Sequence, residues 1–233
     1  YNREEGTVKI IFQVVGSTTE MLDEKKEGEY LCDFVGPLGV ATDIKGLKKV
    51  CVIGGGVGCA IALPIAEELS ASGAEVTSII GFRNRENVIL EDEFIKSSKK
   101  LVLMTDDGSY GEKGFGTVKL QALLESGVKY DEVLAIGPVP MMKFVCKTTE
   151  PFGVHTMVSL NPIMVDGTGM CGGCRVTVGG ETKFACVDGP EFDGHKVDFA
   201  ELMSRNVTYR DREAEVAKDH VCRMEAMGKA LIK

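Results

Sequence analysis

The sequence has 233 residues, with 27 Lys and Arg against 35 Asp and Glu, and a formal net charge of -8 at pH 7. This acidic balance excludes a protein that binds nucleic acid through a basic surface, and no apolar run approaches the roughly 18 residues that a membrane-spanning helix needs. Eight cysteines without a secretory signal are typical of a reducing compartment, where thiols bind metals or fill cores. We therefore expect a cytoplasmic protein that binds neither nucleic acid nor membranes.

The first part of the chain combines two β-type runs with small polar residues. Residues 7–15 and 29–35 are rich in β-branched and aromatic side chains, which predicts two strands. Gly16-Ser17-Thr18-Thr19 lies between them, before a short helix predicted at residues 20–26. Its amides and hydroxyls would suit a phosphate, or would only cap the helix. Gly36-Pro37-Leu38-Gly39 then forms a turn that either approaches a ligand or reverses the chain.

The middle of the chain alternates between strands and helices. Strands are predicted at residues 50–53, 75–80, 100–104, 131–136 and 154–160, and helices from the glycine-rich turn to Ser72 and at residues 116–126. This order predicts a parallel α/β unit. Gly54, Gly55, Gly56 and Gly58 lead from the first strand into a helix, where backbone amides can meet a pyrophosphate. The turn does not match the strict Gly-x-Gly-x-x-Gly fingerprint of dinucleotide-binding sites, because Cys59 stands at the position of the third glycine. The glycines are therefore equally consistent with a dinucleotide site and with tight packing.

Other candidate nucleotide contacts follow the remaining strands of this unit. They are Arg83, Asp106, Gly137, Pro138 and Met141. The carboxyl ends of parallel strands meet at one edge of a sheet, and open α/β sheets bind ligands there. Arg83 and Arg85 would suit a 2′-phosphate, whereas Glu86 would favour a free ribose hydroxyl.

Three cysteines and one acid are crowded into a glycine-rich stretch further along the chain. They are Asp166, Cys171, Cys174 and Cys186. Residues 175–178 and 181–185 are β-type runs around Gly179-Gly180, which predicts a type I′ hairpin that pairs Val178 with Glu181. This register places Cys174 opposite Ala185 and next to Cys186. We therefore predict that these four residues bind a metal.

The spacing favours a [2Fe-2S] cluster over the alternatives. With Asp166 in the first position, the run reproduces the plant-type spacing of cluster ligands. A zinc site with three thiolates and one carboxylate is an alternative interpretation, although zinc ribbons usually present two Cys-x2-Cys pairs and this chain has one. Disulfides also stay open, although three is an odd number for pairing. Asp166 would bind iron, or would only cap the Gly167-Thr168-Gly169 turn.

The remaining cysteines and histidines are not assigned to a site. We expect Cys32, Cys51, Cys59, Cys146 and Cys222 to be core or ordinary thiols, and His155, His195 and His220 share no spacing. A charged helix is predicted at residues 211–227. Asp188-Gly189-Pro190 is expected to be exposed and to contact a partner.

The order of these motifs resembles the ferredoxin-NADP reductase-like family of FAD- and NAD-binding subunits that end in a [2Fe-2S] domain. The resemblance is carried by Gly16-x-Thr18-Thr19, Gly36-Pro37-Leu38-Gly39, the Gly54–Gly58 turn, Gly137-Pro138-x-Pro140-Met141 and the Cys171–Cys186 segment. It implies FAD on a β-barrel, near Gly16, Thr18, Thr19 and Gly36, and NAD(H) on a central α/β domain. The family's flavin-binding arginine strand would lie upstream of Tyr1, so we expect a processed or truncated amino end.

The family has two branches that fit, and they differ at the cluster. The electron-transfer subunit of dihydroorotate dehydrogenase carries four cysteines there, whereas the small subunit of NADH-dependent reduced ferredoxin:NADP oxidoreductase carries Asp in the first position. Asp166 favours the second branch. The resemblance further implies a larger partner subunit with another flavin and more clusters, and a preference for NADH.

The fold class expected is therefore α/β plus β. It comprises the remainder of a flavin-binding β-barrel at residues 1–47, a parallel α/β NAD(H)-binding domain at residues 48–157, and a [2Fe-2S] segment with a carboxyl-terminal helix at residues 158–233. No side chain is expected to act as a catalytic acid or base, because the cofactors carry out the redox chemistry. A zinc-stabilised nucleotide-binding module without redox activity is the alternative of a different class.

Overall fold

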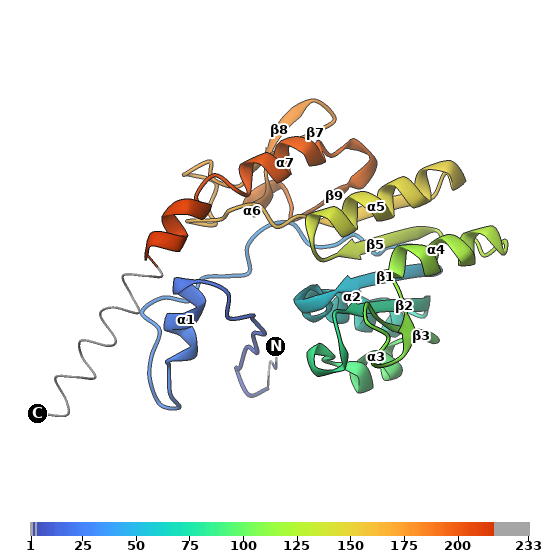
Figure 1. Ribbon diagram of the computed structural model, residues 1–233, viewed down its shortest axis with the longest axis horizontal. Coiled ribbons are helices and arrows are strands. Elements are labelled where there is room, and N and C mark those ends of the chain that lie inside the picture. Colours follow the sequence, from blue (N-terminus) through green and yellow to red (C-terminus); the bar gives the residue numbers. More distant parts are fainter. Residues whose placement is uncertain (1, 3, 217–233) are drawn as a thin grey trace, which may run out of the picture. The chain divides into compact units, whose positions relative to one another are not determined.

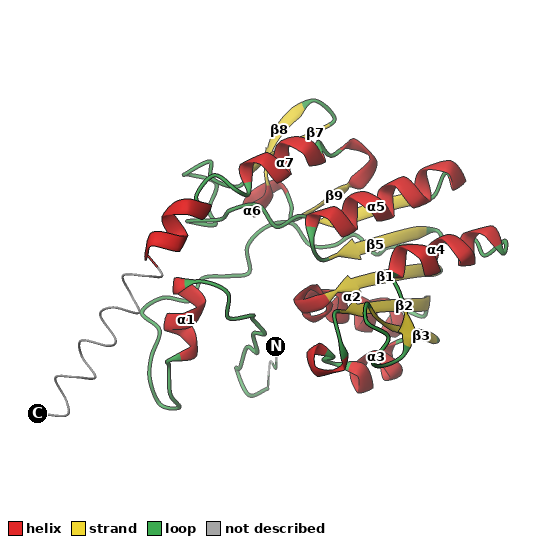
Figure 2. Cartoon of the chain, viewed as in Figure 1, coloured by secondary structure: helices red, strands yellow, loops and turns green. Residues whose placement is uncertain are grey.

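The computed structural model describes residue 2 and residues 4–216. Its internal contacts divide the chain into two compact units, one of residues 1–36 and 204–233 and one of residues 37–203. Figures 1 and 2 show the chain with most of its helices and strands labelled. No helix among the described residues is both long and apolar enough to cross a membrane. The predicted domain boundaries at residues 47 and 157 stay a prediction.

The larger unit is built around a seven-stranded sheet. Its strands are β1 (Lys49–Gly55), β2 (Glu75–Phe82), β3 (Lys100–Thr105), β4 (Glu112–Lys113), β5 (Glu132–Ile136), β6 (His155–Ser159) and β9 (Glu191–Asp193). The order across the sheet is β4-β3-β2-β1-β5-β6-β9, and all neighbours are parallel except β6 and β9. The central strand β1 is buried along residues 50–55, as expected for a strand covered on both faces.

Helices cover both faces of this sheet (Figure 1). The described helices of this part are α2 (Cys59–Ala71), α3 (Glu91–Ser97), α4 (Gly116–Glu125) and α5 (Val139–Thr149), with the short 3-10 turns Gly56–Gly58, Arg85–Asn87, Glu150–Phe152 and Gly194–Lys196. One apolar core joins α2 and α3 to the sheet, and a second joins α4 and α5 to its other face. The predicted alternation of strands and helices is confirmed, while α3 and α5 were not predicted.

The segment after β6 forms a hairpin that packs on the face covered by α4 and α5. Its elements are β7 (Arg175–Val178), β8 (Glu181–Phe184), α6 (Ala185–Asp188) and α7 (Phe199–Arg205). Gly179 and Gly180 have φ of 62° and 81°, which only glycine adopts easily, and Val178 pairs with Glu181 as predicted. Val176, Phe199 and Leu202 are buried in the core shared with α4 and α5.

The prediction of two strands at residues 7–15 and 29–35 is wrong. Apart from α1 (Ser17–Asp23) and one isolated bridge between Asn2 and Thr7, the described part of residues 2–36 holds turns and irregular backbone. A strand needs a hydrogen-bonded neighbour, and β-type composition alone does not supply one. The apolar side chains of these runs are accordingly exposed, with Val15 at 74% and Val35 at 70%.

The predicted carboxyl-terminal helix is only partly within the described residues. Residues 210–216 are helical and exposed. The remainder of the predicted 211–227 helix, together with His220 and Cys222, lies outside the described residues.

Candidate functional site

The hairpin of β7 and β8 brings two of the predicted metal ligands together. The Sγ atoms of Cys174 and Cys186 lie 3.2 Å apart, and both residues are buried. The backbone amide of Ala185 donates a hydrogen bond of 3.2 Å to the carbonyl oxygen of Cys174. This bond continues the ladder one step past β7, so the predicted register at Cys174 is confirmed.

The other two predicted ligands form a second pair in the loop before the hairpin. Asp166 Oδ1 accepts a hydrogen bond of 2.9 Å from the amide of Thr168, and Oδ2 accepts one of 2.8 Å from the amide of Cys171. These bonds, first the one from Thr168, lower the pKa of the Asp166 carboxyl. Asp166 therefore caps this turn in the structure, and its carboxylate lies next to Cys171.

The donor set fits a thiophilic metal or an iron–sulfur cluster in its chemistry. It offers three thiols and one carboxylate, and soft thiolates select iron–sulfur clusters and zinc. Burial, then the thiol of Cys174 and the carboxylate of Asp166, raises the pKa of the Cys186 thiol, and a bound metal would favour its thiolate form. Among the described residues, no three His, Cys, Asp or Glu are close enough to hold a metal ion. The structure thus presents two ligand pairs, Asp166 with Cys171 and Cys174 with Cys186.

Exposed apolar side chains flank these four residues in the chain. Met164, Val165, Met170 and Val187 are exposed, and Met170 reaches 86%. Val187 lies over the loop, because a Cβ at Gly169 would meet its Cγ1 and Cγ2 at 3.2 Å. Exposed apolar side chains that lie close together are typical of a protein contact.

The prediction that Gly189 and Pro190 are exposed is wrong. Gly189 is buried and Pro190 is half-buried. A Cβ at Gly189 would lie 2.5 Å from Phe192 Cε2 and 3.1 Å from the carbonyl oxygen of Ala185. The glycine is therefore required by packing, and only Asp188 of this tripeptide is exposed.

The glycine-rich turn after β1 and the loop after β5 lie against each other. A Cβ at Gly55 would meet Met141 Sδ at 2.5 Å and Pro138 Cδ at 3.1 Å, and one at Gly137 would lie 3.1 Å from Gly55 Cα. Similarly, a Cβ at Gly58 would meet the carbonyl oxygen of Ile136 at 2.5 Å. The sheet order therefore brings the two predicted nucleotide motifs together.

Tight packing accounts for most glycines of this turn without a ligand. A Cβ at Gly54 would lie 2.7 Å from Cys59 Sγ, and Gly55 and Gly58 have the close neighbours described above. Gly56 differs, because it has φ of 56° and open space around its Cβ position. Both interpretations of the turn therefore remain compatible with the structure, since a tightly packed turn also exposes backbone amides at a helix start.

Polar residues follow β2 and β3 at the same edge of the sheet. Arg83 and Asp106 are both exposed, and the amide of Asp106 donates a hydrogen bond of 3.0 Å to the carbonyl oxygen of Phe82. The guanidinium of Arg85 lies over the ring of Tyr110 at 5.3 Å from its centroid. Arg85 is thus held by a cation–π contact.

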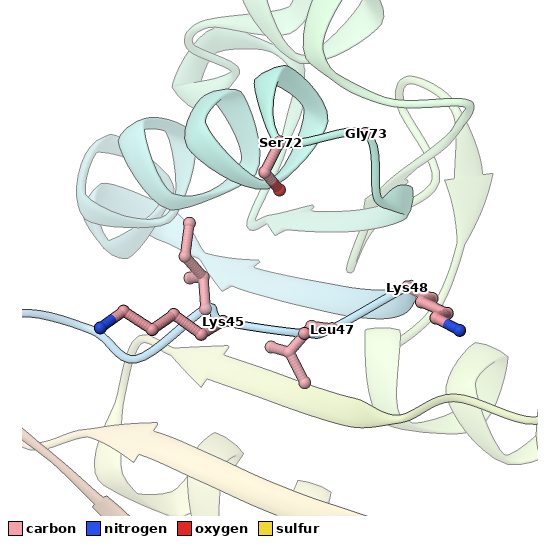
Figure 3. A pocket seen from close by; sticks show the side chains of 7 residues that line it. Lys45, Leu47, Lys48, Ser72 and Gly73 are labelled. Atoms are coloured by element: carbon pink, nitrogen blue, oxygen red, sulfur yellow. The ribbon is translucent and has the colours of Figure 1, made fainter.

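A separate pocket lies at the opposite edge of the sheet (Figure 3). It has a volume of about 410 Å³ and is lined by Ile44, Lys45, Gly46, Leu47, Lys48, Ser72 and Gly73. These residues precede β1 and β2. The pocket is therefore on the side of the sheet away from the predicted nucleotide edge, and no predicted site residue lines it.

The predicted flavin contacts lie in the smaller unit, at and after the start of α1. Gly16 is the N-cap residue, and the hydroxyl of Thr19 accepts hydrogen bonds from the amides of Val15 and Gly16 at 3.0 and 3.1 Å. The structure shows the capping interpretation of this motif. Thr18 and Gly36 are exposed.

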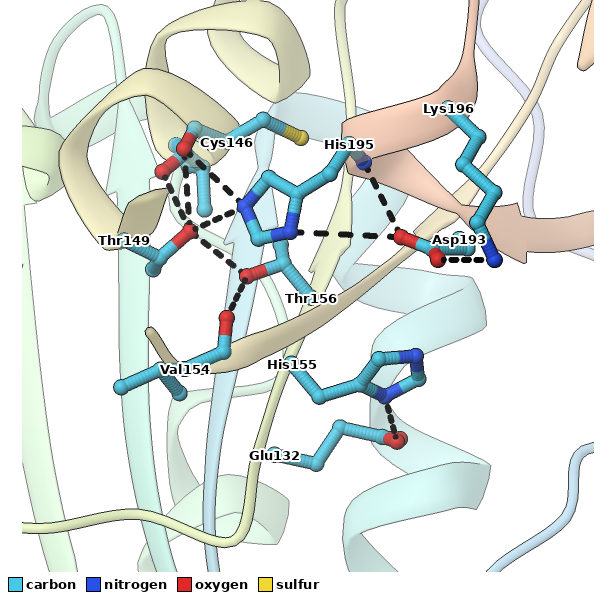
Figure 4. A network of polar contacts seen from close by, with 10 residues as sticks. Glu132, Cys146, Thr149, Val154, His155, Thr156, Asp193, His195 and Lys196 are labelled. Atoms are coloured by element: carbon cyan, nitrogen blue, oxygen red, sulfur yellow. Dashed lines mark hydrogen bonds and ion pairs between the residues drawn. The ribbon is translucent and has the colours of Figure 1, made fainter. Parts of the chain in front are cut away.

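A partly buried polar network that the sequence did not indicate links the segment after β9 to α5 and β6 (Figure 4). The hydroxyls of Thr149 and Thr156 lie 2.6 Å apart, and His195 Nε2 lies 3.1 Å from Thr149 Oγ1 and 3.2 Å from the carbonyl oxygen of Cys146. The amide of His195 donates to Asp193 Oδ1. Histidine spacing could not reveal this contact, because its partners are single hydroxyl and carbonyl groups 46 to 49 residues away.

The second histidine of this region has a charged partner. His155 Nδ1 lies 2.7 Å from Glu132 Oε2. The Glu132 side chain is nearly buried, and burial raises the pKa of its carboxyl while His155 opposes this shift. Both histidines thus have polar partners within the protein.

Comparisons with known proteins agree with the position of the cysteines. Residues 161–198 match the model of the iron-sulfur cluster binding domain of dihydroorotate dehydrogenase B. The chain is similar to a dihydroorotate dehydrogenase B (NAD(+)), electron transfer subunit homolog from Thermotoga maritima, with 49% identity over 210 residues that cover 90% of this chain and 74% of the relative.

A second relative and a solved structure extend this similarity. A probable dihydroorotate dehydrogenase B (NAD(+)), electron transfer subunit from Methanocaldococcus jannaschii is 38% identical over 185 residues, which cover 79% of this chain and 70% of the relative. A chain of the NADH-dependent reduced ferredoxin-NADP oxidoreductase structure superposes with a TM-score of 0.84 and 43% identity, over 91% of this chain and 75% of that chain.

Proposed function

Because the chain belongs to the family of dihydroorotate dehydrogenase B electron-transfer subunits and their homologues, we propose that it carries electrons between NAD(H), FAD and a [2Fe-2S] cluster. It is an electron-transfer subunit of a heteromeric oxidoreductase. The observation that carries the proposal is the proximity of the buried Cys174 and Cys186 sulfurs, at 3.2 Å, inside the segment that matches the cluster-binding family.

The proposed cluster ligands are Asp166, Cys171, Cys174 and Cys186. Cys174 and Cys186 are already adjacent, and Cys171 follows the turn that Asp166 caps. The hairpin register fixes the first pair, while the Asp166 carboxylate would exchange its amide hydrogen bonds for the metal. The Asp in the first position supports the ferredoxin-NADP oxidoreductase branch over a dihydroorotate dehydrogenase subunit.

The protein's own part in the reaction is to bind and orient. A bound FAD would supply the chemistry that links two-electron hydride transfer from a nicotinamide to one-electron transfer to a cluster. The amides of Gly54–Gly58 would face the dinucleotide pyrophosphate at the start of α2, with Gly137, Pro138 and Met141 beside them. Gly16, Thr18, Thr19 and Gly36 are the proposed flavin contacts. No side chain is assigned a proton-transfer role.

NADH is the proposed nucleotide. Arg83 and Asp106 stand at the end of β2 and after β3, where the adenosine ribose of a dinucleotide would lie. The Arg85 guanidinium is engaged by Tyr110, and Glu86 offers an acid to a free ribose hydroxyl. The contact that holds Arg85 and the acid at Glu86 support a nucleotide without a 2′-phosphate, whereas the exposed Arg83 is the group that would attract a 2′-phosphate.

A larger flavin and iron–sulfur subunit is the proposed partner. The exposed apolar side chains Met164, Val165, Met170 and Val187 flank the proposed cluster ligands in the chain. Apolar residues at the centre of an interface exclude water, and an electron acceptor must approach the cluster closely. We therefore assign the partner contact to this surface in place of Gly189 and Pro190.

Anaerobic titration of the full-length subunit in its native complex tests the proposal. NADH is added in small steps while flavin absorbance and the EPR signal of the reduced cluster are recorded. The expected result is bleaching of the flavin together with a new cluster signal. A colourless complex that binds nucleotide and zinc would instead support the non-redox module.

A further inference from the structure

A short segment before the sheet lies along the loop that follows the cluster ligand Cys186. This segment, residues 38–42, is called the strap. The amide of Val40 donates a hydrogen bond of 2.7 Å to the carbonyl oxygen of Gly189. The two residues are far apart in sequence, so this hydrogen bond holds the strap against the loop that follows the proposed ligand Cys186.

Gly39 allows the strap to lie this close. Its φ is 78°, and a Cβ at this position would meet the carbonyl oxygen of Gly189 at 2.5 Å and Pro190 Cδ at 3.4 Å. The left-handed conformation and the short distance to backbone both require glycine. Any side chain at Gly39 would push the strap away from the loop.

The strap also contacts the loop of the ligand Asp166. A Cβ at Gly167, which has φ of 75°, would lie 3.0 Å from Leu38 Cδ1. At the other end of the strap, the Thr42 hydroxyl donates a hydrogen bond of 2.7 Å to Glu191 Oε2. One segment of five residues therefore touches the loop of the first proposed ligand and the loop that follows the last.

We propose that the strap positions the two ligand loops for the cluster, and that Gly39 is the positioning residue that makes this possible. This inference rests on the proposed function for the identity of the metal, but the contacts themselves lie within the larger unit. Leu38 and Gly39 belong to the Gly36–Gly39 turn, which the sequence indicated as either approaching a ligand or reversing the chain. The strap would therefore connect the segment after Gly36 mechanically with Asp166 and Cys186.

The test compares Gly39→Ala with the matched control Gly46→Ala in the full chain. Gly46 has φ of 76° and no atom within 4 Å of its Cβ position, so both variants introduce the same backbone strain. Only Gly39→Ala adds a collision with Gly189. Hydrogen–deuterium exchange is measured over residues 166–171 and 186–191 without added metal, and cluster loss to a chelator is measured in the native complex.

Gly39→Ala is expected to exchange faster in both loops and to lose its cluster faster, each by roughly tenfold or more relative to Gly46→Ala. Thr42→Val, which removes the hydrogen bond to Glu191, should accelerate exchange at residues 186–191, and it decides the question if Gly39→Ala does not fold. Equal hydrogen–deuterium exchange in the ligand loops of the variants and the control would overturn the proposed positioning role of the strap. A wild-type protein without iron would overturn the proposed function, while the exchange data would still decide the role of the strap.

Discussion

The sulfur atoms of Cys174 and Cys186 lie 3.2 Å apart although 12 positions separate the two residues. A two-glycine turn causes this, because its register pairs Val178 with Glu181 and Arg175 with Phe184. The cysteines just outside the ladder therefore meet. The proximity of these two proposed metal ligands is thus a consequence of hairpin geometry.

Replacing either cysteine of this pair should prevent assembly of the cluster. Cys174→Ala and Cys186→Ala are each expected to lose most of the iron of the purified protein, because a missing thiolate leaves iron with an open position. Cys32→Ala is the control, since Cys32 is exposed and lies in the other unit. Iron content per chain checks this, and full iron in both variants would contradict the ligand assignment.

Asp166 can be tested with three substitutions that separate ligation from capping. Asp166→Cys should keep a [2Fe-2S] centre with an altered EPR signal and reduction potential, because thiolate is a softer ligand than carboxylate. Asp166→Ala should make the cluster labile. Asp166→Asn keeps an oxygen that accepts an amide hydrogen bond but carries no charge, so it too should weaken the cluster.

The measurements for this series are EPR spectra, potentiometric titration and iron content. If Asp166 only caps the turn, Asp166→Asn should behave as wild type and Asp166→Cys should leave the spectrum and potential unchanged. That outcome would remove Asp166 from the ligand set.

Local signals predicted the parallel unit and the hairpin from the sequence. The apolar run at residues 50–53 and the Gly179-Gly180 turn each specify their conformation within a few residues, so their structures follow from local chemistry. α5 was missed, because Pro138 and Pro140 mark a turn in the sequence, whereas the structure places Pro138 at the N-cap, where proline is tolerated.

Long-range contacts explain what the sequence could not supply. Residues 7–15 have the composition of a strand, but composition does not show whether a neighbouring strand exists. The burial of Gly189 depends on Gly39 and Phe192, and no pattern links residues 150 positions apart. The cap formed by Asp166 was one of two predicted roles, because carboxylates accept amide hydrogen bonds and bind metals with the same atoms.

Glu191 should make the stability of the larger unit depend on pH. Burial raises the pKa of its carboxyl above 4.5, while the Thr42 hydroxyl opposes the shift. The folded state then binds the proton more tightly than the unfolded state, so the contribution to stability is present below pH 4.5 and is lost as pH rises through the raised pKa. Glu191→Gln should remove this loss.

Urea unfolding of wild type and Glu191→Gln, from below pH 4.5 to neutrality, checks this dependence. The exposed Glu86→Gln serves as control. The free energy of unfolding of Glu191→Gln should decline less with pH than that of wild type and the control. Parallel curves for all three proteins would show that Glu191 titrates normally.

The native complex should reduce its flavin faster with NADH than with NADPH. Stopped-flow absorbance at equal nucleotide concentrations measures both rates. Arg83→Ala is expected to lower the rate with NADPH more than the rate with NADH, because an exposed guanidinium at the end of β2 attracts a 2′-phosphate. A much faster reaction of the wild type with NADPH would show that the nucleotide assignment is wrong.

The most direct test of the account is the metal content and spectrum of the anaerobically purified full-length protein. About two iron atoms per chain, visible absorbance of the iron–sulfur type and an EPR signal on chemical reduction are expected for a [2Fe-2S] cluster. About one zinc atom per chain in a colourless protein would contradict the central claim and identify a structural zinc site.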